Sequence, residues 1–583
     1  MPNRAHRPAR LRLWPVVVLL VLAILSGCAS TRSPNFQPAV ASAHPLATEV
    51  GLDTLANGGN AFDAAVATAA VLGVVEPYSA GIGGGGFWLL QSSDGRTVFV
   101  DAREKAPSQA HATMYLDANG DVHPDKLSVN GPLAAGIPGQ AAAFAHISNH
   151  YGRLPLSTTL GGAIAAANDG FAVDEHYRTL AQWRRAVLAR YPAARRVYLR
   201  NGEVPETGTV LRQPALAGTL TELANHGFDG FYRGQVATRL IEDVTAAGGL
   251  WTEDDLAAYR VIERTPITID YGPYRIWSAP PPSSGGIAMA QMFGMMTARP
   301  LTTLTNTGLL SNDNQPESPS AGTARLHYLT ELMRRAYHDR ALYLGDPDFT
   351  DVPVSRLLDA SYLTRQAGTI RSARATPSDA LEGDFSAGTH TTHLSVLDQD
   401  GNRVSATLSI NLPFGSGFLS AQTGVLLNNE MDDFSIKPGT PNAYGLVGGE
   451  ANKVEPGKRP LSSMSPTLMQ GPERSAIIGT PGGSRIITMV YLGLLDLMSG
   501  ESAANVVSAP RFHHQYLPDV IQHEPGFLEG ELGDELTKLG HSLTDVGRAY
   551  GNMQLIVIDH QTGQTEAASD PRGIGRATVV TGQ

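Results

Sequence analysis

Antiparallel hairpins constrain the fold of this chain more than any other feature of its sequence. Three are indicated by apolar runs on either side of turn residues: Phe87–Gln91 with Thr97–Val100, Thr392–Leu397 with Val404–Ile410, and Asn552–Asp559 with Thr565–Ala568. The first two turns, Ser93-Asp94-Gly95 and Asp398-Gln399-Asp400-Gly401, contain the residue types that tight turns prefer. The core is therefore expected to contain antiparallel sheets.

Helix-like segments flank these hairpins. Apolar residues recur at helical spacing in Ala47–Asn57, in Ala61–Val74 and in Arg485–Leu497, and the strand-like run Ser475–Gly479 precedes the last of them. This pattern indicates an α/β (α+β) chain in which stacked antiparallel sheets lie between helical layers.

The middle of the chain, from about Pro155 to Tyr343, is expected to be mostly helical. Within it, Thr302–Ala321 is rich in Ser, Thr, Asn and Pro, and we interpret it as a flexible insertion.

Composition excludes several classes of protein. With 583 residues, of which 42% are hydrophobic and 17% charged, the chain is globular rather than disordered. Its net charge of −11 argues against a nucleic-acid-binding protein, which needs a basic face. One cysteine cannot form a disulfide framework, a zinc ribbon or an iron–sulfur site.

Residues 1–27 are interpreted as an export signal. Four arginines precede the apolar run Leu13–Leu25, which is too short to span a bilayer: Arg4, Arg7, Arg10 and Arg12. The run ends in Leu25-Ser26-Gly27-Cys28, which resembles the bacterial lipoprotein box, so Cys28 is expected to carry the lipid. The alternative is an ordinary signal peptide with a chance cysteine. Since no aspartate follows Cys28, we expect an exported protein anchored on the periplasmic side of the outer membrane.

Several catalytic motifs are absent. The sequence contains no G-x-S-x-G, S-x-x-K or H-E-x-x-H pattern. Gly83–Gly86 lies between an expected helix and an expected strand, the reverse of a phosphate-binding loop, so a tight turn is the better interpretation. His513 and His514 are adjacent and their side chains should diverge, which indicates a structural pair rather than a metal site.

From its local sequence alone, Thr391 is expected only to begin a β-branched strand. However, several segments resemble the γ-glutamyltransferase family: Ala43–Pro77, Ser79–Phe87, Asp101–Pro107, Thr391–Asn411, Gly424–Pro438 with its string Asn428–Phe434, and Lys458–Arg485. The resemblance implies an N-terminal-nucleophile hydrolase with an αββα sandwich. It also implies cleavage between His390 and Thr391, giving a large subunit (28–390) and a small subunit (391–583) that remain together as a heterodimer.

The implied nucleophile is Thr391, and its chemistry explains the cleavage. A threonine hydroxyl needs a base within hydrogen-bond reach, and a free α-amine with a pKa of about 7.7–8.0 can serve. The amide nitrogen of an uncut chain cannot. Gly482 and Gly483 match the family's oxyanion glycines, whose N–H groups stabilise the developing charge; a plain strand-to-helix turn is the alternative.

The resemblance also assigns substrate-binding residues. Arg103 matches the arginine that binds the α-carboxylate, and its fork suits that group. The other matching positions are Ser462 and Ser463 for the carboxylate, and Asn411, Glu430 and Asp433 for the α-ammonium. Taken singly, they have plainer interpretations: a surface ion pair for Arg103, a turn for the serines and a cap for Asp433.

Two departures and a lid complete the comparison. Position 430 is Glu where many bacterial members have Gln, and an ammonium should still bind there. Ser409 stands where the family usually has a threonine that hydrogen-bonds the nucleophile. Residues 438–449, with Tyr444, match a lid that covers the site in many members.

The predicted protein is a γ-glutamyltransferase and glutathione hydrolase that needs no cofactor or metal. It would transfer a γ-glutamyl group from glutathione or a related donor to water, an amino acid or a peptide. The alternatives are a cephalosporin (glutaryl) acylase of the same fold and an uncleaved, non-catalytic lipoprotein that binds γ-glutamyl peptides.

Overall fold

Two antiparallel sheets lie at the centre of the structure, a computed structural model that describes Met1 and residues 36–300, 319–378 and 391–580. The seven-stranded sheet has the order β18 (Arg576–Val579), β1 (Ala39–Ser42), β9 (Thr392–Leu397), β10 (Arg403–Ser409), β2 (Gly85–Gln91), β3 (Thr97–Ala102) and β6 (Ile262–Arg264). The six-stranded sheet has the order β17 (Thr565–Ser569), β16 (Gln554–Asp559), β12 (Arg474–Gly479), β11 (Thr467–Gln470), β8 (Tyr274–Ser278) and β7 (Ile267–Tyr271).

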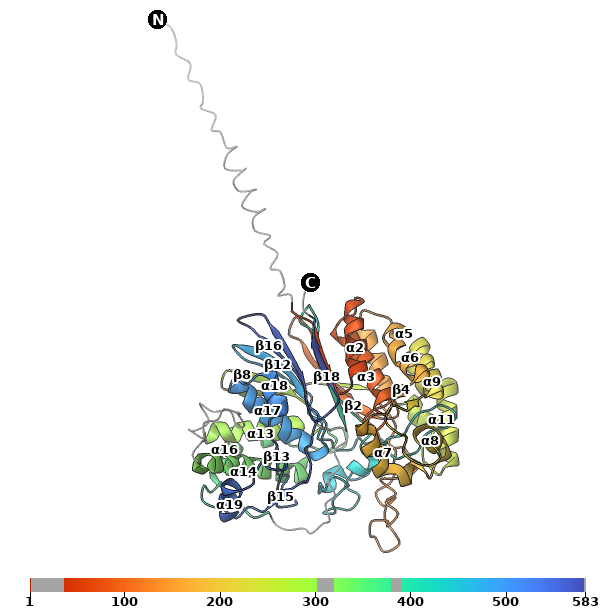
Figure 1. Ribbon diagram of the computed structural model, residues 1–583. Coiled ribbons are helices and arrows are strands. Elements are labelled where there is room, and N and C mark those ends of the chain that lie inside the picture. Colours follow the sequence, from red (N-terminus) through yellow and green to blue (C-terminus); the bar gives the residue numbers. More distant parts are fainter. Residues whose placement is uncertain (2–35, 301–318, 379–390, 581–583) are drawn as a thin grey trace. The chain divides into compact units, whose positions relative to one another are not determined.

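Helices cover the outer face of each sheet (Figure 1). The layer against the seven-stranded sheet is built from the first part of the chain: α2 (Pro45–Ala56), α3 (Ala61–Val75), α4 (Gln140–Tyr151), α5 (Leu156–Thr159), α6 (Gly161–Asp169), α7 (Glu175–Leu188), α8 (Pro192–Tyr198), α9 (Pro214–His226), α10 (Phe228–Tyr232), α11 (Gly234–Ala246) and α12 (Glu253–Ala257). The other layer contains α13 (Gly285–Ala298), α14 (Pro319–Tyr343), α15 (Val354–Leu357), α16 (Ala360–Gly368), α17 (Ile486–Met498), α18 (Ala503–Ser508) and α19 (Glu531–Lys538).

Short elements connect these layers. They are the 3₁₀ turns η1 (Pro132–Ala134), η2 (Glu430–Asp433), η3 (Glu450–Asn452) and η4 (Gly483–Arg485), the pair β4 (Phe171–Ala172) and β5 (Val210–Leu211), and the small sheet of β13 (Phe512–His513), β14 (Ile521–His523) and β15 (Leu543–Asp545). Among the described residues, no helix is both long and apolar enough to cross a bilayer.

Strand β2 shows why the sheets stack. Side chains alternate across a strand, so Trp88 and Leu90 join the core under the α3 layer while Phe87 and Leu89 join the core that contains the second sheet. All of β2 is buried. Both faces of the sheet are therefore covered, as the predicted αββα sandwich requires.

Helix α3 shows how local sequence sets an element. Asn60 caps its first turn by accepting from the N–H groups of Phe62 and Asp63, and the Asp63 carboxylate accepts from the Asn60 N–H in return. The rest of the helix is rich in alanine and valine and almost entirely buried. A helix that is apolar all round belongs inside a protein.

Most elements expected from the sequence are confirmed, including the three hairpins. The stretch Pro155–Tyr343 is mostly helical, as expected, but it also contains the short pair β4 and β5 and the sheet strands β6, β7 and β8. The residues of these sheet strands alternate in burial, and the strands are stable because they extend sheets whose central strands come from elsewhere in the chain. The predicted insertion lies outside the described residues as far as position 318, and its last three positions belong to α14.

The predicted turn at Gly83–Gly86 is confirmed as a close backbone approach. A Cβ on Gly83 would lie 2.1 Å from the Leu426 carbonyl oxygen, and one on Gly84 would lie 2.2 Å from that of Ser409. Side chains are excluded at both positions. The glycines let this loop pack directly against the end of β10.

Both sheets contain strands of the two predicted subunits. Strand β1 lies between β9 and β18, β2 pairs with β10, and β8 pairs with β11. Backbone hydrogen bonds of both sheets thus join residues before position 390 to residues after it. A cut before Thr391 would leave the two pieces held together by this shared core.

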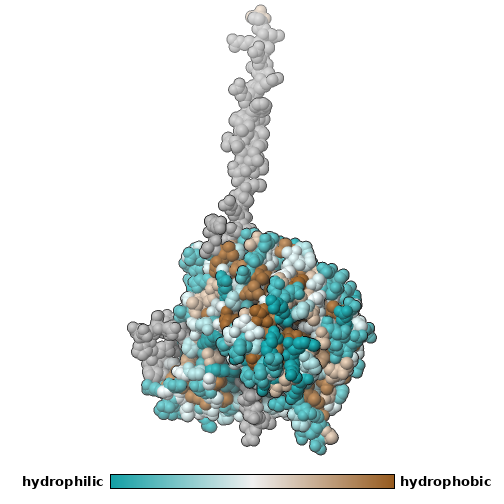
Figure 2. Space-filling model, turned by 45° about the vertical axis from the view of Figure 1, so that its right-hand side comes forward, coloured by the Kyte–Doolittle hydropathy of each residue, from teal (hydrophilic) through white to brown (hydrophobic). Residues whose placement is uncertain are grey.

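The surface offers few large apolar areas. On the face shown in Figure 2, hydrophilic residues surround several small hydrophobic patches. Large exposed hydrophobic side chains among the described residues, such as Trp183 and Phe349, are scattered along the chain.

Candidate active site

Thr391 immediately precedes β9 and is buried, with 7% of its surface exposed. Its hydroxyl oxygen Oγ1 accepts a hydrogen bond of 3.1 Å from the Gly482 N–H. Thr392 pairs with Leu408 across the β9–β10 ladder, so Thr391 and Ser409 occupy the next positions on neighbouring strands. The sheet thereby fixes where the predicted nucleophile lies.

The glycines at the end of β12 form the turn that faces Thr391. Gly482 has φ of 152° and Gly483 has φ of 56°, and L-residues with side chains rarely adopt such values. A Cβ on Gly482 would also lie 2.3 Å from Cε of Met489. Glycine is therefore required for an N–H to point at Thr391, as an oxyanion donor must.

A small cavity of about 20 Å³ brings the predicted site together. Its lining includes Thr391, Ser409, Gly483, Arg103, Asn411, Asp433, Tyr444, Ser462 and Ser463. Gly482 and Glu430 reach it through their bonds to Thr391 and Arg103. Segments more than 300 positions apart thus converge beside the nucleophile.

Arg103 is the centre of a buried ion cluster. It is 1% exposed, and its Nη1 lies 2.9 Å from Glu430 Oε2 while its Nη2 lies 2.5 Å from Asp433 Oδ2. Its Nε donates to the Pro460 carbonyl oxygen at 3.2 Å, and Glu104 lies 3.7 Å from Nη1. The plainer interpretation of Arg103 as a surface ion pair is therefore wrong.

The carboxylates around Arg103 have perturbed acidity. Burial raises the pKa of Glu104 to about 7, although Arg103 opposes the shift. Burial likewise raises the pKa of Glu430 well above its usual range, again against the pull of Arg103. One guanidinium cannot neutralise three carboxylates, so the cluster would gain from an added cation.

The hydroxyl and amide groups around the cluster are suited to a zwitterion. Ser462 Oγ accepts from the Met464 N–H at 3.1 Å, which leaves its proton free to donate. Asn411 Nδ2 donates to the Asn429 carbonyl oxygen, whereas Asn411 Oδ1 is buried without a partner among the described residues. The cavity thus offers hydroxyl donors to an anion and an amide acceptor to an ammonium.

Ser409 differs from expectation. Its Oγ accepts a hydrogen bond of 2.7 Å from the Asn411 N–H. No hydrogen bond joins Ser409 to Thr391 in the described part of this uncleaved chain. The two residues are neighbours, but the hydrogen bond that Ser409 Oγ accepts comes from the Asn411 backbone.

The predicted lid closes over the cavity. The Tyr444 hydroxyl donates to the Asn411 carbonyl oxygen at 2.9 Å. Asp432 holds the same segment by accepting from the Ala443 N–H at 2.9 Å and from the Ser128 hydroxyl at 2.7 Å. Asn442 Nδ2 reaches Asp433 Oδ1 at 3.2 Å. The lid is therefore tied to the residues that would bind the ammonium.

Sequence reasoning missed Arg340, which lies in α14 and lines the same cavity. It is 5% exposed and contacts Ser284 and Ser463. Nothing in the helix sequence marks it, because Arg334 and Arg335 of the same helix are also buried. Glu104 was missed as well, although it follows Arg103 directly.

Two larger cavities lie near the site. One, of about 180 Å³, is lined by Thr391 together with Glu76, His176, Asn552 and Arg572; burial raises the pKa of Glu76 to about 7. The other, of about 390 Å³, flanks the lid at Asn442 and Ala443 and does not reach Thr391.

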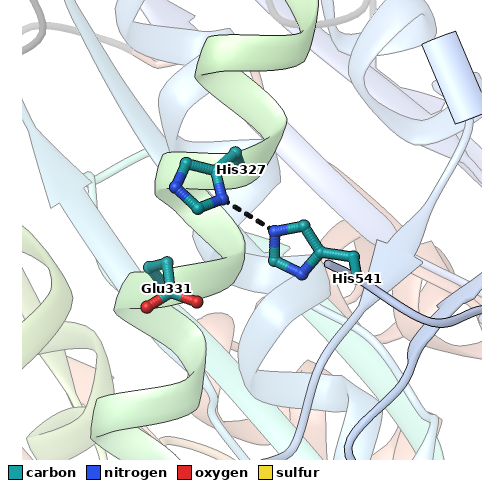
Figure 3. Close-up of side chains that lie close together, drawn as sticks. All are labelled: His327, Glu331 and His541. Carbon is teal, nitrogen blue, oxygen red and sulfur yellow. Dashed lines mark hydrogen bonds between the residues drawn. The ribbon is translucent and has the colours of Figure 1, made fainter. Parts of the chain in front are cut away.

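A separate cluster of possible metal ligands joins α14 to the turn before β15. His327 and Glu331 project from α14 towards His541 (Figure 3), and His327 Nδ1 lies 2.7 Å from His541 Nε2. His327 Nε2 bonds to the Arg371 carbonyl oxygen, and both oxygens of Glu331 are taken by arginines. These ligand atoms are already paired beside two cations, so the cluster does not fit a metal ion and serves to join helix and turn.

Of the remaining predictions, one concerns described residues and the others do not. His513 and His514 do diverge, with His513 bonded to Thr488 and Gln515 and His514 to Asp519. His390, Cys28 and, apart from Met1, the signal at 1–27 lie outside the described residues.

Comparisons with known proteins agree with this geometry. The family model described as Gamma-glutamyltranspeptidase matches residues 47–580. The glutathione hydrolase proenzyme of Escherichia coli (strain K12) is 40% identical over 550 residues, which cover 93% of this chain and 92% of that protein. That of Bacillus subtilis (strain 168) is 34% identical over 569 residues, covering 93% and 91%.

Solved structures are similar too. Cephalosporin acylase from Bacillus halodurans has a TM-score of 0.79 at 26% identity, covering 94% of this chain and 97% of the other. Gamma-glutamyltranspeptidase from Helicobacter pylori has a TM-score of 0.54 at 37% identity, covering 58% of this chain and 94% of the other.

Proposed function

Since this chain belongs to the gamma-glutamyltranspeptidase family, we propose that it is a γ-glutamyltransferase and glutathione hydrolase that activates itself by cleavage between His390 and Thr391. Its αββα architecture is that of the N-terminal-nucleophile hydrolases, as the sequence predicted. One observation carries the proposal: a buried arginine, acidic side chains and the Thr391 hydroxyl meet in a single cavity.

Cleavage supplies the base. In the uncut chain the nitrogen of Thr391 is an amide and cannot take a proton. Once the preceding bond is hydrolysed, the free α-amine lies beside the hydroxyl of the same residue and can deprotonate it. The large subunit (28–390) and small subunit (391–583) then stay together as a heterodimer through the shared sheets.

The ion cluster supports recognition of a γ-glutamyl headgroup. In the resting chain Arg103 pairs with Asp433 and Glu430. A substrate brings an α-carboxylate and an α-ammonium, so the carboxylate can take Arg103 while the ammonium takes Asp433. Arg103 and Asp433 each keep an oppositely charged partner through this exchange, which avoids the cost of leaving either charge buried and unpaired.

Acyl transfer then follows from the positions of the groups. Thr391 Oγ attacks the γ-carbonyl carbon, the α-amine takes the hydroxyl proton, and N–H groups at Gly482 and Gly483 receive the oxyanion. The C–N bond breaks as that proton passes to the leaving amine, which for glutathione is the cysteinylglycine amine. Water or the amine of an amino acid or peptide releases the acyl group from the ester.

The lid must move for this to happen. The cavity has the volume of about one water molecule, and a γ-glutamyl group is several times larger. Tyr444 and its neighbours therefore open to admit the donor and close again over it.

Thr391 variants test the proposal. Thr391→Ala should remain one band near 61.8 kDa on a denaturing gel and be inactive on a γ-glutamyl anilide, whereas Thr391→Ser should be cut and retain activity. Activity in the alanine variant, or active wild-type protein without a new amino end at Thr391, would refute the nucleophile.

Two alternatives are separated by simple comparisons. A glutaryl acylase would accept a glutaryl anilide at least as well as the γ-glutamyl compound; the glutaryl group lacks the ammonium, so it leaves Asp433 and Glu430 unpaired and should be discriminated against. A non-catalytic binding protein would stay a single band in wild-type form.

We further propose that Cys28 carries a lipid after removal of residues 1–27 and anchors the protein to the periplasmic side of the outer membrane. The lipoprotein-like box and the arginines before it support this. Mass spectrometry of the mature amino end tests it: Cys28→Ala should abolish the acyl mass and release the protein from the membrane fraction, and an unmodified wild-type amino end would contradict it.

A further inference from the structure

Arg340 is a buried cation that faces the donor cavity without a carboxylate of its own. Its Nε donates to Ser284 Oγ at 3.0 Å and its Nη2 lies 3.4 Å from Ser463 Oγ. No carboxylate among the described residues forms an ion pair with it. Burial lowers its pKa, and the nearby Arg103 adds to that shift. An arginine nevertheless stays protonated in a protein, so the cavity holds a positive charge whose side-chain hydrogen bonds go to two serine hydroxyls.

The hydrogen bond from Arg340 to Ser463 determines where the Ser463 hydroxyl proton can point. A serine hydroxyl has one proton and two acceptor lone pairs. Since the Ser463 oxygen accepts from Arg340, its proton is left to donate elsewhere, and Ser463 lines the cavity. Ser462 is in the same state, because its oxygen accepts from the Met464 N–H. Two hydroxyl protons are thus available to one anion.

Arg340 also sets the position of the serine loop. Ser284 accepts from Arg340 and donates to the Ser462 carbonyl oxygen at 2.8 Å. Arg340 is therefore bonded directly to Ser463 and through Ser284 to Ser462. Helix α14, through Arg340, therefore helps to position the hydroxyl groups of both Ser462 and Ser463.

We propose that Arg340 is a specificity-determining positioning residue for the donor's α-carboxylate: it directs the Ser463 proton into the cavity and supplies a second buried positive charge that an anionic headgroup neutralises. The proposal rests on the proposed function. It explains how the site can attract a carboxylate before Arg103 has exchanged Asp433 and Glu430 for it. A headgroup without that carboxylate gains nothing from Arg340.

Substrate analogues separate this role from a purely structural one. Arg340→Gln and Arg340→Lys are compared with wild type on γ-glutamyl-p-nitroanilide and on 4-aminobutyryl-p-nitroanilide, which lacks only the α-carboxylate. We expect Arg340→Gln to raise KM for the γ-glutamyl compound about 10- to 100-fold, the effect of losing a charged hydrogen-bonding partner. KM for the 4-aminobutyryl compound should change less than about threefold, and Arg340→Lys should restore part of the discrimination.

Inhibition constants give the same comparison without turnover. L-Glutamate should lose about 10- to 100-fold in affinity in Arg340→Gln while 4-aminobutyrate is unchanged. Ser463→Ala in combination with Arg340→Gln should cost less than the two single effects multiplied, because both act on one hydroxyl.

Controls keep the outcomes distinct. Arg335→Gln removes a buried arginine of the same helix that does not line the cavity, and should leave the discrimination between the two anilides unchanged. Gels and thermal melting confirm that each variant is cut and folded. Equal losses on both substrates in a folded Arg340→Gln, or unchanged discrimination in both Arg340 variants, would overturn the inference. An inactive wild-type enzyme would instead refute the proposed function.

Discussion

The backbone N–H of Gly482 donates to the hydroxyl oxygen of Thr391 at 3.1 Å, across 91 positions of sequence. In a tetrahedral intermediate the oxyanion is bonded to the same carbon as this hydroxyl oxygen. A donor that contacts Oγ in the resting chain is therefore within reach of the charge that develops during acyl transfer.

Gly482→Ala should reduce kcat about 10²- to 10³-fold, the usual effect of losing an oxyanion donor. The added Cβ meets Met489, and the φ of 152° is unfavourable for alanine. Steady-state kinetics on the γ-glutamyl anilide measure the loss. Gly218→Ala is the control, because its Cβ meets no atom within 4 Å; a kcat for Gly482→Ala as high as for this control would contradict the assignment.

Asp433→Asn should shift preference between substrates. The variant removes the anion that pairs with the α-ammonium, so kcat/KM for the γ-glutamyl anilide should fall at least about 30-fold, as for a buried ion pair losing one partner. The value for the glutaryl anilide should hold or rise. Asp270→Asn, which alters an exposed ion pair with Arg275, is the control. Equal losses of kcat/KM on both substrates would show that Asp433 does not recognise the α-ammonium.

Tyr444→Phe should loosen the lid. It removes one neutral hydrogen bond, from the Tyr444 hydroxyl to the Asn411 carbonyl oxygen, worth about 1 kcal/mol. KM for the γ-glutamyl anilide should rise about fivefold, with a smaller change in kcat. Tyr274→Phe removes a comparable bond to the Met498 carbonyl oxygen and should leave KM unchanged. An unaltered KM in Tyr444→Phe would argue against closure through this bond.

Acid should destabilise the protein through buried neutral histidines. Burial lowers the pKa of His393 and His541 to about 3 and that of His514 to about 4. Because the unfolded chain titrates near 6.5, it binds more protons than the folded chain between about pH 6.5 and pH 3, so stability falls as pH falls through that window.

For His541 the loss between pH 7 and pH 5 is about 2 kcal/mol. His541→Asn should therefore show a smaller drop in melting temperature over this range than wild type, measured by circular dichroism. His226→Asn, at an exposed position, should behave like wild type. Identical pH slopes for His541→Asn and wild type would show that this histidine is not the source.

Much of the fold could be predicted because its signals are local. Turn residues and apolar alternation act over a few positions, so the β9–β10 hairpin was located within a residue or two. Strands β7 and β8 were missed for the opposite reason. They are short, partly exposed and set in a helical region, and they are stable as strands only because β11 pairs with β8 from nearly 200 residues away and β7 pairs with β8 in turn.

In the candidate site, too, some features could be predicted from the sequence and others could not. Thr391, Gly482 and Arg103 lie in motifs that resemblance could match one position at a time. The partners of these residues in the resting chain could not be read in that way: Ser409 is bonded to Asn411 rather than to Thr391, and Arg103 holds Asp433 and Glu430.

Sequence resemblance was enough to predict which residues carry the chemistry, because the nucleophile, the glycine turn and the carboxylate-binding arginine each lie in a segment that matches the family. Only the folded arrangement could show that Arg340 lies against Ser463, 123 positions away, or that each sheet contains strands from both sides of position 390. Such contacts depend on how whole layers pack, and packing joins surfaces whose sequences contain no sign of each other.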